Sequence, residues 1–286
     1  MISDITLGQF FPGKSILHKL DPRTKILIAT IFIVAVFLAN TPIAFAVLLI
    51  TTAAAVICSK ISTRVILKGI KPIIYVLLFT AIINIFLTKG DTTPLLSWWI
   101  IEIYTEGIVR AIFMALRVVI LIIGTSTFLT YTTSPISLTD GIESLLAPLK
   151  LIHIPVHIFA MMMTIALRFI PTLVEETEKI MNAQKSRGAD FSSGGLIKRA
   201  KTLIPILIPL FVASFKRANE LATAMECRCY RGDKNRTKLV KLSFRWKDLI
   251  LFTFALIFLG TIISLRILPN VMSLDAGFWG VIFYVF

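Results

Sequence analysis

Long apolar runs separated by short polar segments make up the first half of the chain and return near its end. A helix needs ~20 predominantly apolar residues to cross a bilayer, and these runs come close to that length. The first two are slightly short, so we expect them to extend into their flanks as a tight hairpin. The pattern therefore predicts about five transmembrane helices, over residues 26–39, 43–58, 72–87, 108–130 and 249–265.

The pattern changes between residues 134 and 247. Apolar stretches such as 154–174 and 203–215 are interrupted by prolines, which should break the helices, and charged segments separate them. Charge at this density does not cross a bilayer, so we predict long amphipathic helices, partly at the membrane surface and partly in the cytoplasm. Two points stay open: whether 154–174 dips into the bilayer, and whether the tail 270–286 is interfacial, re-entrant or a short extra span.

These patterns divide the chain into three parts. Residues 1–133 hold the N-terminal segment and the first four membrane helices, residues 134–247 form the cytoplasmic or interfacial domain, and residues 248–286 form the final membrane helix and tail. The expected fold class is an all-α polytopic membrane protein with a domain of long amphipathic helices.

The composition agrees with this class. The chain is 56% hydrophobic and 16% charged, with a mean hydropathy of +0.85, whereas a soluble domain would need many more solvated side chains. The formal net charge of +14 gathers in connecting segments such as the one with Lys60, Arg64, Lys68 and Lys71. By the positive-inside rule this connector and the N-terminus are predicted to face the cytoplasm. A cytoplasm-facing location would keep Cys227 and Cys229 reduced.

One short segment resembles a nucleotide-binding motif. Gly8 to Ser15, GQFFPGKS, satisfies the P-loop pattern of glycine, four residues, then Gly-Lys-Ser. A working P-loop follows a buried strand, and the few residues before Gly8 cannot supply one. Pro12 also removes one of the N–H groups that the phosphate cradle needs. We therefore interpret the match as accidental and predict that this chain binds no nucleotide.

Candidate metal and catalytic groups are sparse. His153 and His157 stand four apart, but Pro155 lies between them and no third ligand is evident, so we interpret them as structural histidines. Cys227 and Cys229 are too few for a zinc site. No nucleophile motif and no paired intramembrane carboxylates are found, so we predict neither a catalytic nor a metal site.

Two arginines in the middle domain have similar surroundings. Each stands between small residues at the expected end of a helix, one turn after an alanine, Ala183 or Ala224. Small neighbours leave a guanidinium free to reach a carboxylate or carbonyl of a partner protein with bidentate geometry. An ordinary basic helix end, stabilised by the helix dipole and anionic headgroups, is the equal alternative. The two segments are Ser186-Arg187-Gly188 and Cys227-Arg228-Cys229.

With these motifs the sequence resembles the transmembrane T-components of energy-coupling factor (ECF) transporters. That family carries two motifs of the type small-Arg-small, often Ala-Arg-Gly, in a cytoplasmic coupling domain, and both occur here in the expected order. The N-terminal stretch from Leu17 to Lys25, LHKLDPRTK, is also similar to the family. The resemblance covers nearly the whole chain. The departures are Ser186 and Cys227 in place of alanine and Cys229 in place of glycine, and all three remain small.

The resemblance implies a function without chemistry in this chain. A T-component joins two ABC-type ATPase subunits, which bind the ATP, to a substrate-binding membrane S-component for uptake of a vitamin or metal ion. Ser186, Arg187 and Gly188, and likewise Cys227, Arg228 and Cys229, would bind the ATPase subunits. Exposed apolar faces of the coupling helices would dock the S-component. Met161, Met162 and Met163 are candidates for that contact, although plain packing is at least as good a reading. The family implies a bacterial plasma membrane.

A self-sufficient permease or channel is the alternative function. It would line a path through the membrane with polar residues, but Asn84, Arg110 and Arg117 alone interrupt the clear spans. The two arginines stand seven apart on one helical face, which we expect to pack inward or to snorkel to an edge. A membrane-bound enzyme is a third possibility, and it lacks a catalytic cluster.

Overall fold

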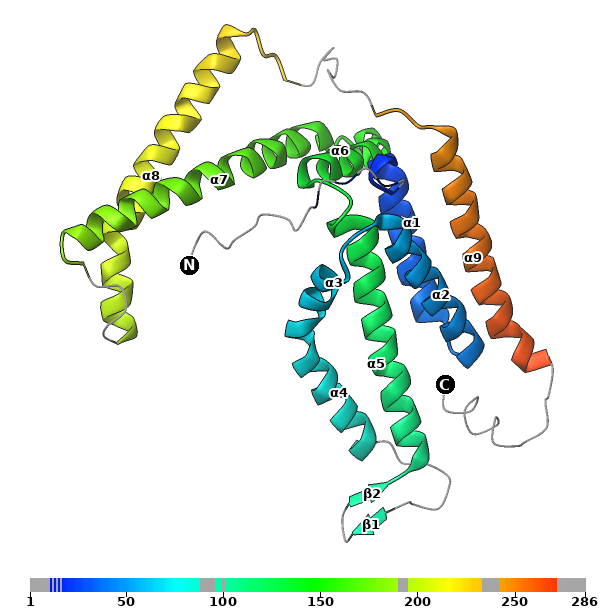
Figure 1. Cartoon of the computed structure of the whole chain (residues 1–286). Helices are drawn as coiled ribbons and strands as arrows, with labels where there is room; N and C mark the ends of the chain where they lie inside the picture. The colour runs from blue at the N-terminus through cyan, green and yellow to red at the C-terminus, as the bar shows by residue number, and fades with distance from the viewer. Residues whose placement is uncertain are drawn as a thin grey trace. The chain divides into compact units, whose positions relative to one another are not determined.

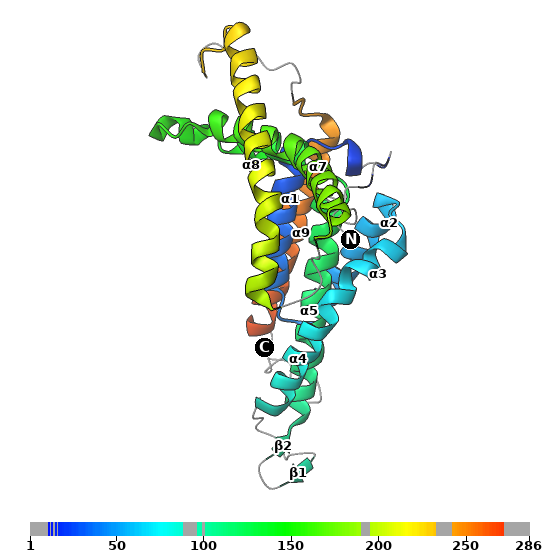
Figure 2. The ribbon, with the colours of Figure 1, turned by 90° about the vertical axis from the view of Figure 1, so that its left-hand side faces the viewer.

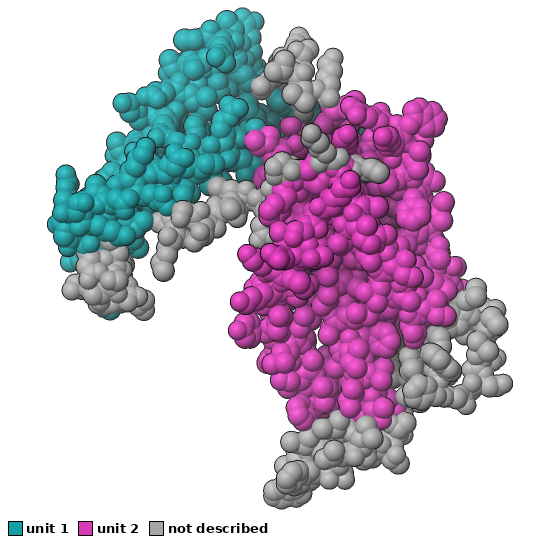
Figure 3. Space-filling model, in the orientation of Figure 1, with its two compact units in different colours: residues 1–8, 142–241 teal, residues 9–141, 242–286 magenta. Residues whose placement is uncertain are grey.

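The computed structural model describes residues 11, 13, 15, 17–87, 96–98, 101–189, 195–232 and 242–271. They form helices and one short two-stranded hairpin (Figure 1). The chain divides into two compact units, shown in different colours in Figure 3. We call residues 9–141 with 242–286 the membrane unit, and residues 1–8 with 142–241 the crossed-helix unit. The all-α polytopic class expected from the sequence is confirmed.

The membrane unit begins with two helices that start in the same way. Asp21 caps the N-terminus of α1 (Pro22–Leu38) by accepting a hydrogen bond from the Arg23 amide at 2.9 Å. Thr41 caps α2 (Pro42–Ser59) by accepting one from the Ala44 amide at 3.2 Å. Proline fits the first position of a helix because no partner is needed there for its missing N–H. The Asn-Thr-Pro sequence thus makes the predicted hairpin between the two helices.

The rest of the membrane unit consists of short helices, two short strands and two long helices. The short helix α3 (Thr63–Ile70) leads through a 3₁₀ turn, Lys71–Ile73, into α4 (Ile74–Leu87). Antiparallel strands β1 (Leu96–Trp98) and β2 (Ile101–Ile103) precede α5 (Thr105–Thr125), which runs on as a π-helical turn, Ser126–Thr130. Helix α6 (Pro135–Leu145) follows and leads into the crossed-helix unit. The chain re-enters the membrane unit before α9 (Trp246–Val271).

The core of the membrane unit lies between α1, α2, α5 and α9. Phe45, Leu48 and Ile262 are at most 1% exposed there. Helix α5 approaches α1 closely, since a methyl group at Gly124 would lie 2.2 Å from the Phe32 ring. Small residues at helix contacts are typical of membrane bundles. The core residues are Phe32, Ala35, Val36, Ala39, Ala44, Phe45, Leu48, Ile120, Phe258 and Ile262.

A buried polar cluster joins three elements at one end of this unit. The ammonium group of Lys25, a residue only 3% exposed, donates to the carbonyl oxygens of Thr132 at 2.8 Å and His18 at 3.3 Å. The carboxylate of Asp248, at the start of α9, accepts from the Asp21 amide at 2.8 Å. The polar ends of α1 and α9 and the turn after α5 are thereby held together.

Six of the described helical segments are long and apolar enough to cross a membrane. Each predicted run falls mainly on one helix, with run 72–87 starting in the 3₁₀ turn before α4 and run 108–130 ending in the π-helical turn after α5. Helix α1, at 17 residues, is shorter than these six segments. Two of the six lie in the segment that we expected to be amphipathic and partly cytoplasmic, and that expectation stays a prediction. The segments are Pro42–Ser59, Thr63–Phe86, Thr105–Thr130, Val156–Ser186, Lys201–Cys227 and Trp246–Ile267.

The crossed-helix unit consists of two long helices and the elbow before them. Helices α7 (Val156–Ser186) and α8 (Leu196–Cys227) cross steeply (Figures 1 and 2). An ion pair joins them, with Nη2 of Arg217 lying 2.9 Å from Oε2 of Glu176. The elbow is the last turn of α6, a 3₁₀ helix (Ala147–Ile152) and the residues up to α7.

The prolines of this unit act differently from one another. Pro155 precedes α7 and Pro148 lies in the 3₁₀ helix, so both mark helix boundaries, as expected. The expectation that the others break the helices is wrong, because α7 continues through Pro171 and α8 through Pro205 and Pro209. An interior proline removes one hydrogen bond and kinks a helix without necessarily ending it. All three are exposed, so the surroundings can accommodate the kink.

Candidate partner-binding site

Arg187 is the C-cap residue of α7, and the two residues after it close the end of the helix with backbone hydrogen bonds. The Gly188 amide donates to the Lys185 carbonyl at 2.9 Å, and the Ala189 amide donates to the Gln184 carbonyl at 3.0 Å. Gly188 has a φ of +87°. These two bonds around a left-handed residue are the Schellman motif, which satisfies carbonyls that would otherwise lack partners at the helix end.

The end of α8 repeats this geometry around Arg228. The Cys229 amide donates to the Glu226 carbonyl at 2.9 Å, and the Tyr230 amide donates to the Met225 carbonyl at 3.0 Å. Cys229 has a φ of +55°, in the left-handed region. The two arginines also share backbone angles, with φ and ψ of −85° and 6° at Arg187 and −88° and 14° at Arg228. The two motifs are therefore one structural device used twice.

This geometry explains the small residues around each arginine. The position after the arginine must adopt a left-handed backbone, which glycine does without cost and a residue with a Cβ does only under strain. The alanines one turn earlier are part of the same backbone ladder, because the Arg187 amide donates to Ala183 O at 3.2 Å and the Arg228 amide to Ala224 O at 3.3 Å. Ser186 folds its hydroxyl back onto the Asn182 carbonyl at 3.1 Å, away from the guanidinium.

Both arginine side chains are exposed. Among the residues that the structure describes, neither guanidinium has a hydrogen-bond or ion-pair partner. By contrast, Arg217 in the middle of α8 pairs with Glu176. A guanidinium offers five N–H donors in a planar fork that matches a carboxylate or a pair of carbonyls. The crossed-helix unit thus presents two equivalent, uncommitted cationic groups, each at the tip of a long helix.

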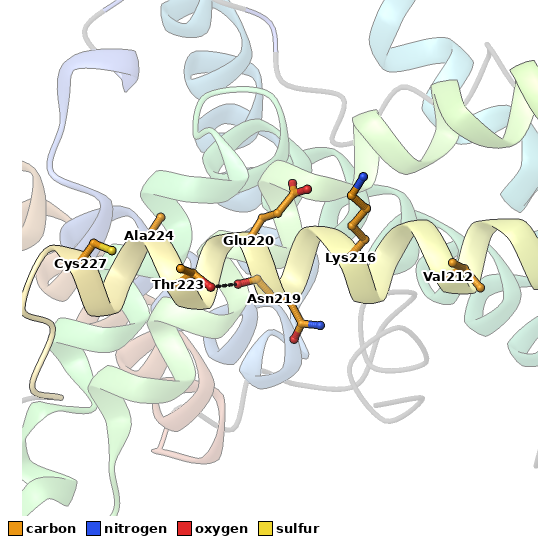
Figure 4. Close-up of a pocket in the computed structure, with 7 residues that line it drawn as sticks. All are labelled: Val212, Lys216, Asn219, Glu220, Thr223, Ala224 and Cys227. Atoms are coloured by element: carbon orange, nitrogen blue, oxygen red, sulfur yellow. Dashed lines mark hydrogen bonds between the residues drawn. The ribbon is translucent and has the colours of Figure 1, made fainter.

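A shallow strip on α8 leads toward Arg228 and was not predicted from the sequence. Figure 4 shows its residues along one face of the helix, on a single element and without an enclosing wall. Its middle part is polar and its two ends are apolar or small, so it offers hydrogen bonds along the helix before the arginine end. The residue spacing of three and four was the signal available in the sequence. The strip consists of Val212, Lys216, Asn219, Glu220, Thr223, Ala224 and Cys227.

Both long helices also expose apolar side chains. Met162 and Met163 on α7 are 49% and 53% exposed, whereas Met161 is half-buried. On α8 an apolar stripe recurs with helical spacing, and its two phenylalanine rings lie 4.8 Å apart. Exposed apolar area of this kind marks a protein or membrane contact. The α8 stripe consists of Ile204, Ile208, Phe211 and Phe215, each between 48% and 65% exposed.

The two histidines have different surroundings. Nδ1 of His157 lies 2.9 Å from Oε1 of Glu143, and both residues are less than 10% exposed, so the imidazole is committed to that carboxylate. His153 is exposed, with a left-handed backbone at the end of the 3₁₀ helix. Over the described ranges no group of three His, Cys, Asp or Glu side chains could hold a metal ion. The P-loop-like segment lies mostly outside the described residues, and its Ser15 hydroxyl lies 2.6 Å from Nδ1 of His18.

The arginine in the centre of α5 packs inward, one of the two expected outcomes. Nη2 of Arg117 donates to the carbonyl oxygen of Ala39 at 2.7 Å, and the guanidinium lies 5.4 Å from the centre of the Phe45 ring. It therefore binds the C-terminal end of α1, where the helix dipole favours a cation. Arg110, on the same face, is half-buried.

The fold and the site together define a class: a polytopic helical membrane protein with a separate unit of two crossed, arginine-ended helices. The family described as cobalt transport protein, CbiQ, matches residues 13–239 of this chain. Proteins described as "Energy-coupling factor transporter transmembrane protein EcfT" match more closely over most of its length.

The relative from Ruminiclostridium cellulolyticum is 54% identical over 266 residues, covering 93% of this chain and 98% of the relative. The one from Clostridium kluyveri is 54% identical over 267 residues, with coverage of 93% and 98%. The one from Lactococcus lactis is 47% identical over 250 residues, with coverage of 87% and 93%. The chain therefore belongs to the family of transmembrane components of ECF transporters, a family of multi-pass cell-membrane proteins, as the resemblance implied.

Proposed function

We propose that this chain is the non-catalytic coupling subunit of an ECF importer. It joins two ABC-type ATPase subunits to a substrate-binding S-component and transmits their ATP-driven movement to that partner, for uptake of a vitamin or metal ion. The observation that carries the proposal is the pair of equivalent, exposed arginine ends, because two identical devices suit two similar partners. ATP is bound and hydrolysed by the partners, and this chain needs no cofactor of its own.

Each arginine end binds one ATPase subunit. Arg187 and Arg228 lie at helix tips, where a groove on a partner can surround the guanidinium and supply carboxylate or carbonyl acceptors. The small neighbours Ser186, Gly188, Cys227 and Cys229 keep the approach free. This places the arginine ends and the N-terminus on the cytoplasmic side, where the ATPase subunits are.

Movement passes from these tips along α7 and α8. The Arg217–Glu176 ion pair links the two helices where they cross. A movement of one helix tip is therefore transmitted to the other helix. The S-component docks on the exposed apolar side chains of the same helices, among them Met162, Met163 and the α8 stripe. Methionine is suited to contacts with more than one partner because its side chain is flexible and polarisable.

Co-purification and uptake test the proposal. With both arginines replaced, R187A/R228A, the tagged chain should still insert in the membrane, but it should lose the ATPase subunits and ATP-dependent uptake. The matched control K179A/K201A removes two exposed cations from the same helices and should keep both. Retention of the ATPase subunits by R187A/R228A would contradict the proposal, and so would uptake by this chain alone in liposomes, which would favour the permease alternative.

A further inference from the structure

Helix α3 and the residue that caps it carry a basic stripe on one side: Arg64 and Lys68 lie on α3, and Lys71 is its C-cap. Arg64, Lys68 and Lys71 recur at intervals of four and three residues, so they fall within an arc of about 60° around the helix axis. All three side chains are exposed. The opposite side of α3 faces the protein, since Ile66 is 7% exposed and a methyl group at Gly69 would lie 2.8 Å from Oη of Tyr131. The packing therefore turns the basic stripe outward.

The three cations are not neutralised within the protein. None of the described residues gives them a hydrogen bond or a carboxylate, in contrast to Arg217, which pairs with Glu176 at 2.9 Å. The sequence from residue 22 to residue 90 contains no Asp or Glu at all. Three neighbouring like charges repel one another, so an anion supplied from outside would be favoured.

The position of α3 indicates the source of that anion. The helix follows α2 and forms the first part of the candidate span Thr63–Phe86, which α4 continues, and Figure 1 shows it set at an angle to α4. Three residues separate it from α2, which keeps it within about 15 Å of the end of that helix. Leu67, beside the stripe, is 65% exposed. A short helix with outward cations and an exposed leucine at the end of a candidate membrane span is suited to the lipid headgroup region.

We propose that Arg64, Lys68 and Lys71 bind the phosphate of anionic phospholipid headgroups in the leaflet next to α3. Arg64 supplies a planar fork for two phosphate oxygens, and the lysines add compact charges. Leu67 contacts the upper acyl chain. The connector thereby acts as a specific lipid contact that holds the start of α4 at the membrane surface.

Binding of short-chain lipids to the purified full chain in detergent tests this, with native mass spectrometry as the readout. Wild type should bind dioctanoyl phosphatidylglycerol roughly tenfold more tightly than dioctanoyl phosphatidylcholine, because each cation near an anionic surface contributes measurably. The variant R64Q/K68Q/K71Q should lose that preference. The conservative variant R64K/K68R/K71R should keep it, and circular dichroism checks that all variants retain their helices.

The matched control K179Q/K201Q/K216Q removes the same charge from exposed positions of the crossed-helix unit. It should keep the preference for phosphatidylglycerol. If it loses the preference equally, binding follows net charge and the proposal is overturned. It is also overturned if R64Q/K68Q/K71Q binds like wild type, or if glycerol 3-phosphate at the same concentration displaces the lipid, since the site would then bind a soluble anion.

Discussion

At the scale of single residues, the two arginine ends differ most in the residue that follows the arginine. Gly188 and Cys229 occupy the same left-handed capping position, with φ of +87° and +55°. The cysteine carries a Cβ in a conformation that costs an L-residue ~1–2 kcal/mol. The α8 end is therefore the more strained copy of the device, and the strain lies directly beside Arg228.

Replacing this cysteine with glycine should relieve the strain. We expect C229G to stabilise the end of α8 by about 0.5–1 kcal/mol, since the greater freedom of glycine in the unfolded chain offsets part of the gain. In C229G, amide hydrogen exchange at position 229 and at Tyr230 should slow by roughly twofold to fivefold. The matched change G188A should have the opposite effect on the amide of Ala189. Faster exchange in C229G would show that the thiol stabilises the cap.

Arg117 makes a polar contact inside the membrane unit that should contribute to stability. The Ala39 carbonyl that it binds belongs to a residue 1% exposed, so R117L should leave a buried acceptor unsatisfied and cost about 1–3 kcal/mol. Thermal unfolding in detergent should show a midpoint several degrees lower, with R117K intermediate because a lysine keeps the charge without the fork. An unchanged midpoint for R117L would mean that water replaces the guanidinium.

At the scale of elements, the elbow before α7 sets the direction of a long lever. The helix has 31 residues and is therefore about 46 Å long, so a tilt of about 5° at its start would displace its far end by about 4 Å. The buried contact between His157, in the first turn of α7, and Glu143, in the last turn of α6, spans this elbow at 2.9 Å. It holds the first turn of α7 against the last turn of α6.

Removing the Glu143–His157 contact should make the start of α7 less rigid while both arginines stay in place. We expect E143L to lower uptake per ATP hydrolysed by roughly tenfold in the assembled transporter, because a buried imidazole loses its acceptor. E143Q, which keeps an oxygen acceptor, should retain most of the coupling. The control H153N alters the exposed histidine, whose left-handed backbone asparagine tolerates. Full coupling in E143L would show that packing alone positions α7.

The elements show which features the sequence could reveal. Each predicted apolar run lies mainly on one helix, and Asp21 and Thr41 could be recognised as caps because each precedes a proline. Both helix ends were expected from the sequence, but the left-handed backbone at Cys229 could not be, since a cysteine gives no sign of it. The Glu143–His157 contact depends on how the chain folds back over the elbow. The sequence predicts breaks at Pro171, Pro205 and Pro209 wrongly, because it does not show whether the surroundings accommodate a kink.

At the scale of the whole molecule, the two arginine ends belong to one unit and are joined by the helix crossing. If each end binds one of two ATPase subunits that also contact each other, the second attachment benefits from the first through effective concentration. The loss of one end should then weaken the complex without changing its composition. Loss of both ends should dissolve it.

The single variants R187A and R228A test this coupling between the two ends. We expect each to retain both ATPase subunits at high protein concentration, with affinity lowered by roughly 10²-fold because one of two linked attachments is gone. Uptake should fall further than assembly, since only one helix tip then follows the partner. Mass measurement of the complex across a dilution series reads out composition and affinity together. A complex that loses exactly one ATPase subunit in either variant would show that the two ends bind independently, with no contact between the partners to link them.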